Sequence, residues 1–120
     1  MAALPADLIV RHVYGVTVIR LKLSNVSSAA DISRLTATIT EMIESGSTRI
    51  VLDLKHVRYV GSATLGMLLA LQQTINQHGG KMVLSNPEPV EELLRISKTA
   101  RLFTLAPDPK KGLAMIKPSN

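Results

Sequence analysis

The sequence contains no cysteine and no tryptophan. The lack of cysteine excludes disulfides, thiolate metal sites and thiol nucleophiles, and it is compatible with a reducing compartment. Aromatic residues are nearly missing too, being limited to Tyr14, Tyr59 and Phe103. Modules that bind single-stranded RNA stack bases on aromatic side chains, so this scarcity argues against such a function. The core must be built from aliphatic residues and methionine.

Long apolar runs are missing as well. No stretch of about 18 apolar residues occurs, so no membrane span is expected. Residues 1–6 lack a basic region followed by a long apolar stretch, and they do not resemble a secretion signal. We therefore expect a cytoplasmic protein. A length of 120 residues with 46% hydrophobic residues predicts one domain, residues 1–120, with one core.

Acidic residues are outnumbered by basic ones, and the formal net charge is +5. The basic residues are scattered, and only Lys110 and Lys111 are adjacent. This distribution favours a solvated mixed surface over a nucleic-acid footprint. A positive surface would also suit an acidic protein partner.

The first half of the chain predicts a hairpin followed by a helix. Leu8–Val10 and the alternating run 16–23 flank Tyr14-Gly15, which is typical of two strands joined at a tight turn. Ser24–Ser28 is a polar loop. Apolar residues then recur on one helical face, and Ser28 and Gly46 suit the two ends of a helix over about 28–45. The residues of that face are Ile32, Leu35, Ile39, Met42 and Ile43.

The second half alternates strands with helices. We predict strands at 50–54, 82–84 and 102–105, a helix from Leu65 to about His78, a third helix from Pro87 and a short last helix over 110–116. One side of the second helix is expected to carry Leu65, Leu68, Leu69, Gln72 and Ile75. Met67, Ala70 and Leu71 widen its apolar arc, so we expect this helix to be well buried. Such alternation indicates an α/β fold with a mixed, mostly parallel sheet of about five strands and about four helices.

The most informative segment is 51–66, where a buried strand ends, a loop follows and a helix begins. Sites of open parallel sheets gather beyond the carboxyl ends of the strands. A helix N-terminus there has unpaired N–H groups that would favour a phosphorylated Ser or Thr. Two simpler interpretations stay open at this point: Ser62 is an ordinary helix N-cap, and Asp53 is an acceptor that stabilises the loop.

This segment resembles the STAS domain of anti-sigma factor antagonists. The family signature is Asp-Leu-Ser, then Asp-Ser-Ser-Gly-Leu-Gly, then a leucine-rich helix that ends in Gly-Gly before a short strand. The matching residues are Asp53-Leu54-Lys55, Gly61-Ser62-Ala63-Thr64-Leu65-Gly66, Leu68-Leu69, Gly79-Gly80 and Met82-Val83-Leu84. The resemblance covers about residues 7–117 and implies a STAS-type fold.

The resemblance also implies a function. Family members bind an anti-sigma factor, a histidine-kinase-like serine/threonine kinase, and so free a sigma factor. The kinase phosphorylates the second serine of the motif, and that position is Ala63 here; the preceding Asp is Gly61, and Ser24–Ser28 lacks the usual acidic residue. The remaining hydroxyls are Ser62, our first choice for phosphorylation, and Thr64, our second. Expected partner-binding residues are Asn25, Ser27, Asp53, His56, Arg58, Gly61, Ser62, Ala63 and Thr64.

The sequence gives little support to a metal site or to an enzymatic active site. His12, His56 and His78 lie far apart without an acidic ligand cluster, so neither a metal nor another cofactor is expected. Asp53, His56 and Ser62 suggest a triad only superficially, because no nucleophile elbow is present. We therefore expect no enzyme. Two alternatives stay open: a structural STAS subunit or scaffold of a sensory complex, and, less favoured, a basic nucleic-acid-binding domain. A dimer also stays open.

Overall fold

The computed structural model describes residues 7–118. Residues 1–6 and 119–120 lie outside this range. The prediction that residues 1–6 are not a secretion signal therefore falls outside the described residues. The elements follow the predicted order, with two short strands and one short 3₁₀ helix added. They are β1 (Leu8–Val13), β2 (Val16–Leu21), β3 (Asn25–Val26), α1 (Ala29–Glu44), β4 (Arg49–Asp53), β5 (Tyr59–Val60), α2 (Ser62–Gln77), β6 (Lys81–Ser85), α3 (Glu88–Ile96), η1 (Ala100–Leu102), β7 (Thr104–Ala106) and α4 (Pro109–Ile116).

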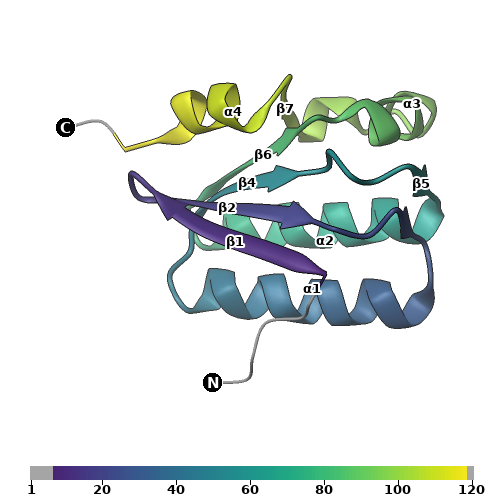
Figure 1. Ribbon diagram of the computed structural model, residues 1–120, viewed down its shortest axis with the longest axis horizontal. Coiled ribbons are helices and arrows are strands. Elements are labelled where there is room, and N and C mark those ends of the chain that lie inside the picture. The colour runs from purple at the N-terminus through teal and green to yellow at the C-terminus, as the bar shows by residue number, and fades with distance from the viewer. Residues whose placement is uncertain (1–6, 119–120) are drawn as a thin grey trace.

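The main sheet has five strands in the order β1-β2-β4-β6-β7. Only the β1–β2 pair is antiparallel, and the other neighbouring pairs are parallel. This confirms the predicted mixed, mostly parallel sheet. Parallel neighbours need crossover helices, which α1, α2 and α3 supply. Figure 1 shows α1 and α2 side by side on one face of the sheet, with α4 on the other side.

The β1–β2 turn confirms the predicted hairpin. Tyr14 and Gly15 both have positive φ, 52° and 79°. Two consecutive residues in this region form the turn whose twist matches that of the flanking strands. Glycine adopts such a φ without strain, whereas tyrosine does so at a cost. The turn is therefore held by the pairing of the two strands.

Helix α1 shows why its ends lie where they do. The Ser28 hydroxyl accepts a hydrogen bond from the Asp31 N–H at 3.1 Å, as an N-cap does. A side-chain hydrogen bond of Ser28 with the Asp31 carboxylate, and then one from the Arg34 guanidinium, lower the pKa of Asp31 from its ordinary value. Arg34 also pairs with Asp7, which fastens the start of β1 to this helix. Gly46, with φ of 114°, follows the helix as predicted.

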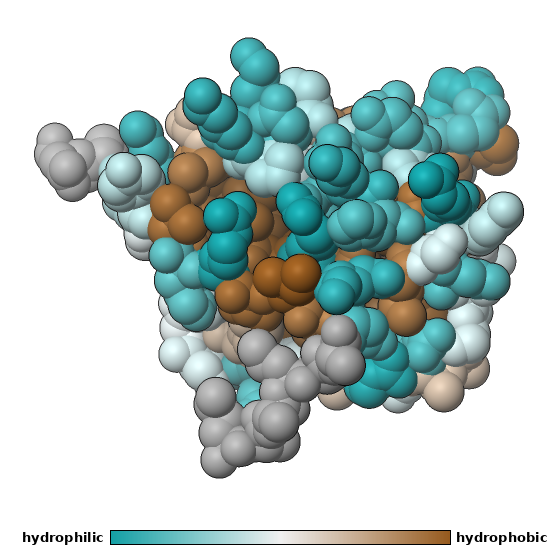
Figure 2. All heavy atoms as spheres, viewed as in Figure 1, coloured by the Kyte–Doolittle hydropathy of each residue, from teal (hydrophilic) through white to brown (hydrophobic). Residues whose placement is uncertain are grey.

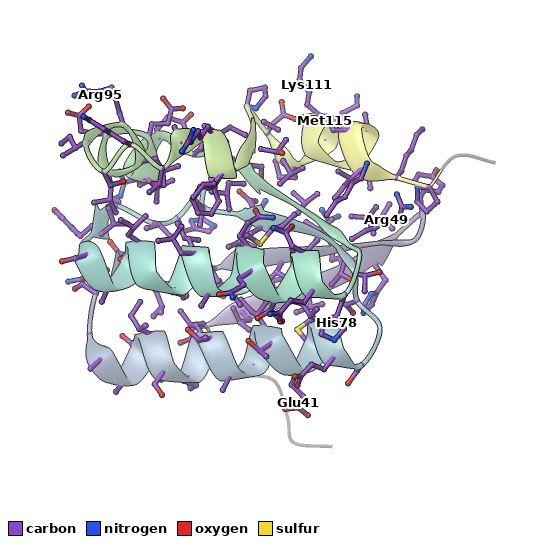
Figure 3. All side chains as sticks on the ribbon, turned by 180° about the vertical axis from the view of Figure 1, so that it is seen from behind. Glu41, Arg49, His78, Arg95, Lys111 and Met115 are labelled. Atoms are coloured by element: carbon purple, nitrogen blue, oxygen red, sulfur yellow. The ribbon has the colours of Figure 1, made fainter. Side chains whose placement is uncertain are left out.

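The core lies on both faces of the sheet. The larger cluster joins the sheet to α1, α2 and α3 through residues such as Leu35, Leu68 and Leu94. The smaller cluster lies under α4 and consists of Val16, Val18, Val51, Val83, Ala106 and Ile116. Gly112 lets α4 approach closely, since a Cβ there would lie 3.2 Å from Val51 Cγ1. Arg49 donates to the Ile116 carbonyl at 2.7 Å, and Figure 3 shows Arg49 near the end of α4.

Two details differ from the predictions. The buried residues of α2 are Thr64, Met67, Leu68, Leu71 and Ile75, whereas Leu65, Leu69 and Gln72 are only half-buried. Leu68 and Ile75 are buried as predicted, and the buried face is turned toward Met67 and Leu71, which belong to the wider apolar arc of this helix. The predicted strand 102–105 is also wrong at its start, because Leu102 ends η1 and β7 begins at Thr104. Within residues 7–118, no helix is long and apolar enough to cross a bilayer.

Candidate functional site

Two loops meet beyond the carboxyl ends of the parallel strands. One is the 22–28 segment after β2, and the other is the 54–61 segment between β4 and α2. Residues 25–26 pair in parallel with residues 59–60, forming the small β3–β5 sheet. The Ser24 carbonyl also accepts bonds from the N–H groups of Arg58 at 2.7 Å and Tyr59 at 3.0 Å. The structure therefore brings together the two segments that sequence analysis assigned to partner binding.

Thr64 fastens helix α2 to this pair of loops. Its hydroxyl accepts a hydrogen bond from the Gly61 N–H at 3.0 Å and donates one to the Val26 carbonyl. The side chain is only 3% exposed. Because both hydrogen-bonding roles are taken and the group is buried, a kinase has no access to Thr64 in this conformation. This burial is evidence against our second choice of phosphorylation site.

Ser62 is not the N-cap of α2. The cap residue is Gly61, which has no side chain to offer, and Thr64 supplies the capping bond in its place. The alternative interpretation of Ser62 as an ordinary cap is therefore wrong. Ser62 is the first helical residue, and both Ser62 and Ala63 are exposed. A group on Ser62 would lie at the positive end of the helix dipole, with no acidic residue in the first turn to oppose it.

Asp53 lies inside the molecule and cannot touch a partner directly. Its carboxylate is fully buried and accepts bonds from Arg20 Nε at 2.8 Å, Asn86 Nδ2 at 2.7 Å and the Lys55 N–H at 3.1 Å. These contacts confirm the interpretation of Asp53 as a loop-stabilising acceptor. They join the carboxyl ends of β2, β4 and β6, so Asp53 acts on the site by positioning the loop that follows it.

Sequence reasoning missed two members of this network, Arg20 and Asn86. Asn86 has a positive φ of 50°, a conformation that asparagine tolerates better than most residues. The signal in the sequence that could have indicated its role was its position directly after a buried strand. Arg20 lies in an otherwise apolar strand, which was the signal for a buried acidic partner. Both residues are 33 positions from Asp53, so neither signal identified the contact.

The remaining predicted residues lie on the surface of the same region. Asn25, Ser27, His56 and Arg58 are exposed, and Gly61 is half-buried. Tyr59, which belongs to the 55–64 loop expected to form this surface, is 64% exposed between them. The exposed charges of this loop, Lys55 and Arg58, are both positive. The surface thus combines an uncovered helix N-terminus with basic and polar side chains.

The geometry gives no support to a catalytic or metal centre. His56 makes no hydrogen bond with Asp53, whose oxygens are occupied by other donors. His12 lies beside Thr17 on the hairpin, and His78 lies at the far end of α2, as Figure 3 shows. Among residues 7–118, no group of three or more metal-ligating side chains is present.

Comparisons with known proteins agree on one family. A family profile described as STAS domain matches residues 7–112. A Bordetella bronchiseptica protein named "Putative anti-sigma factor antagonist BtrV" is 30% identical over 96 residues, which is 79% of this chain and 83% of that protein.

Solved structures share the fold. An anti-sigma-factor antagonist (STAS) domain protein from Planctomyces limnophilus superposes with a TM-score of 0.76 at 22% identity, covering 92% of this chain and 98% of that one. The Bacillus cell fate determinant SpoIIAA in its phosphorylated form superposes with a TM-score of 0.67 at 19% identity, covering 87% and 95%.

Proposed function

Because this chain belongs to the STAS domain family, among its anti-sigma factor antagonists, we propose that it binds an anti-sigma factor kinase in the cytoplasm and thereby regulates transcription that depends on a sigma factor. The partner is expected to be a histidine-kinase-like ATPase. The observation that carries this proposal is the surface around the first turn of α2. Ser62 and Ala63 are exposed there, while Thr64 joins the helix to the neighbouring loops.

A preformed surface favours binding without a large ordering cost. The β3–β5 pairing and the bonds of Thr64 and Asp53 hold three segments together before a partner arrives. Lys55 and Arg58 suit an acidic patch on the partner, which would raise the association rate more than the final affinity. The expected function is therefore binding, with no covalent step performed by this chain.

Control by phosphorylation is the finer part of the proposal. Ala63 has no hydroxyl to receive phosphate, so the usual family position cannot act as the switch. Ser62 is exposed and lies at the helix N-terminus, which makes it the hydroxyl best placed for modification. We propose that binding is constitutive unless Ser62 is phosphorylated.

The test begins with a pull-down from the source cell using the folded chain as bait. Recovery of a histidine-kinase-like ATPase, with at least about tenfold weaker recovery by the Arg58→Glu variant, supports the proposal. Arg95→Glu serves as the matched control, because Arg95 lies on α3 and points into solvent (Figure 3). A well-folded bait that recovers no such ATPase contradicts the proposal. The recovered ATPase is then incubated with the chain and ATP, and intact mass and site mapping report any phosphate.

A further inference from the structure

The face of the sheet opposite α1 and α2 is only partly covered. Helix α4 covers the valines of the smaller cluster, but Ile9 on β1 remains 41% exposed. Ile9, Arg11, Val18 and Arg20 line a hollow of about 300 Å³ on this face. Figure 2 shows hydrophobic surface gathered on the side where β1 and β2 lie, with hydrophilic side chains standing among it. The hollow shares Arg20 with the Asp53 network, and none of its lining residues belongs to α2.

The hollow lies beside an open sheet edge. Strand β1 is the first strand of the sheet order, and among the described residues it has a neighbour only on the β2 side. It is six residues long and contains no proline, whereas β7 at the opposite edge has three residues. Proteins usually shield such an edge with very short strands, proline, charges or a covering element. Within residues 7–118, the charge of Arg11 is the one such device on β1, and no strand pairs with its outer main-chain groups.

The side chains along this edge carry positive charge that is not fully balanced. The register pairs Ile9 with Arg20 and Arg11 with Val18, so both guanidinium groups lie on one face in diagonal positions. Arg20 uses Nε for Asp53 and is 35% exposed. Arg11 is exposed and makes no ion pair within residues 7–118. A surface that combines apolar side chains with two basic groups suits a peptide segment that contains both apolar and acidic residues.

We propose that β1 binds an extended acidic segment of a partner protein as an additional strand of the sheet. Main-chain hydrogen bonds along β1 would give affinity, and side chains at alternate positions would give specificity. An acidic side chain would lie opposite Arg11, and an apolar side chain would lie opposite Val10 on the other face. The site does not involve α2, so it would remain available while the kinase is bound.

A second copy of this chain fits the edge less well. Two β1 strands could pair in antiparallel orientation so that the two sheets form one continuous sheet with corresponding faces on the same side. The two-fold axis between the strands would then pass beside Val10 or beside Arg11. The second register places the two Arg11 side chains directly opposite each other. The register centred on Val10 places the Arg11 and Arg20 side chains of both copies on one face of the sheet. Like charges at such positions destabilise a sheet, so the charge pattern favours an acidic partner.

The test uses two labelled eight-residue peptides, one alternating valine with glutamate and one alternating valine with lysine. Fluorescence anisotropy should show binding of the glutamate peptide to the intact chain at low salt, and hydrogen exchange should show protection of the β1 amides. Arg11→Glu should weaken that binding at least about tenfold and improve binding of the lysine peptide. Arg101→Glu is the matched control, because Arg101 is exposed on η1 beside the opposite edge strand.

Three results would overturn the proposal. Equal loss of binding in Arg11→Glu and Arg101→Glu would show a general charge effect. Unchanged affinity for a glutamate peptide that is N-methylated at every residue would show that no strand is added. Self-association of Arg11→Ala by light scattering, with peptide affinity unchanged, would show that Arg11 only guards the edge against a second copy. No ATPase is needed, so failure here is distinct from failure of the proposed function.

Discussion

At the scale of single residues, the first turn of α2 separates two roles that one serine combines in the family motif. Ala63 keeps the small exposed surface at the usual switch position but has no hydroxyl. Ser62, one residue earlier, keeps the hydroxyl and lies at the helix N-terminus. Under the proposed function, binding and modification would fall on different residues, so each can be tested alone.

Ser62→Asp should weaken binding to the kinase at least about tenfold, because burying an ill-paired charge in an interface costs several kcal/mol. Ser62→Ala should abolish phosphate labelling and leave binding nearly unchanged. Titration calorimetry and intact mass measure the two effects. A label that persists in Ser62→Ala and disappears in Thr64→Ala would contradict the choice of Ser62. Tight binding by homogeneously phosphorylated protein would contradict the switch.

Substitution of Asp53 should affect the ends of three strands, because its carboxylate joins β2, β4 and the residue after β6. Asp53→Asn keeps the shape but places an amide donor against Arg20 Nε, and we expect it to lower the free energy of unfolding by about 2 kcal/mol. Asp53→Ala should cost more, since it removes the acceptor for all three donors. Urea unfolding measures both changes.

The control for Asp53 is Glu92→Gln. Glu92 pairs with Arg95 on the surface, where both side chains are more than half exposed. Loss of that pair should change stability by less than about 1 kcal/mol. Effects of equal size for Asp53→Asn and Glu92→Gln would show that the buried network contributes no more than an exposed pair.

At the scale of elements, one hydroxyl, that of Thr64, joins the start of α2 to the neighbouring loop after β2. Thr64→Val should lower the free energy of unfolding by about 2 kcal/mol, because the Gly61 N–H and the Val26 carbonyl lose their partner in a buried place. Thr64→Ser keeps the hydroxyl and is the matched control. Chemical unfolding measures stability, and kinase affinity shows whether the loops still meet. If valine and serine variants behave alike, the hydroxyl does not fasten the helix.

The elements also show what the sequence can predict. The apolar spacing that includes Leu35 and Ile39 predicted α1 to within a residue at each end, because one clear stripe faces the sheet. Helix α2 was predicted from Leu65 but begins at Ser62, and its buried face is turned from the predicted side toward Met67 and Leu71. The strands β3 and β5 have two residues each, and no periodicity can be detected at that length. They form because the two loops are brought together by the sheet.

At the scale of the whole molecule, the two faces of the sheet are covered unequally. Three helices and the larger cluster lie on one face, while α4, with eight residues, and a six-residue cluster lie on the other. The sequence predicted both the fold and the edge at which the loops meet, because strand ends in a parallel sheet share one side. It did not predict that β1 would keep an uncovered face, since coverage depends on where the last helix packs.

Because the smaller cluster lies away from the candidate site, a substitution in it should lower the stability of the fold without weakening the binding of the partner. Ile116 is 5% exposed in the smaller cluster and lies beside Arg49, the first residue of β4, whereas the candidate site follows Asp53, the last residue of that strand. Ile116→Ala should therefore lower the free energy of unfolding by about 2–3 kcal/mol, from lost burial and the cavity left behind. Kinase affinity should stay within about twofold, because the loops at the other end keep their bonds to Thr64 and Asp53.

Met115 provides the matched control for that change. It is the neighbouring residue on α4, it is 51% exposed, and Figure 3 shows it on the helix surface. Met115→Ala should change stability by less than about 0.5 kcal/mol. Urea unfolding and titration calorimetry on the same preparations give both quantities. A fall in kinase affinity in Ile116→Ala under conditions where the variant is fully folded would show that α4 and the candidate site are coupled through the sheet, and that the two ends of β4 do not act independently.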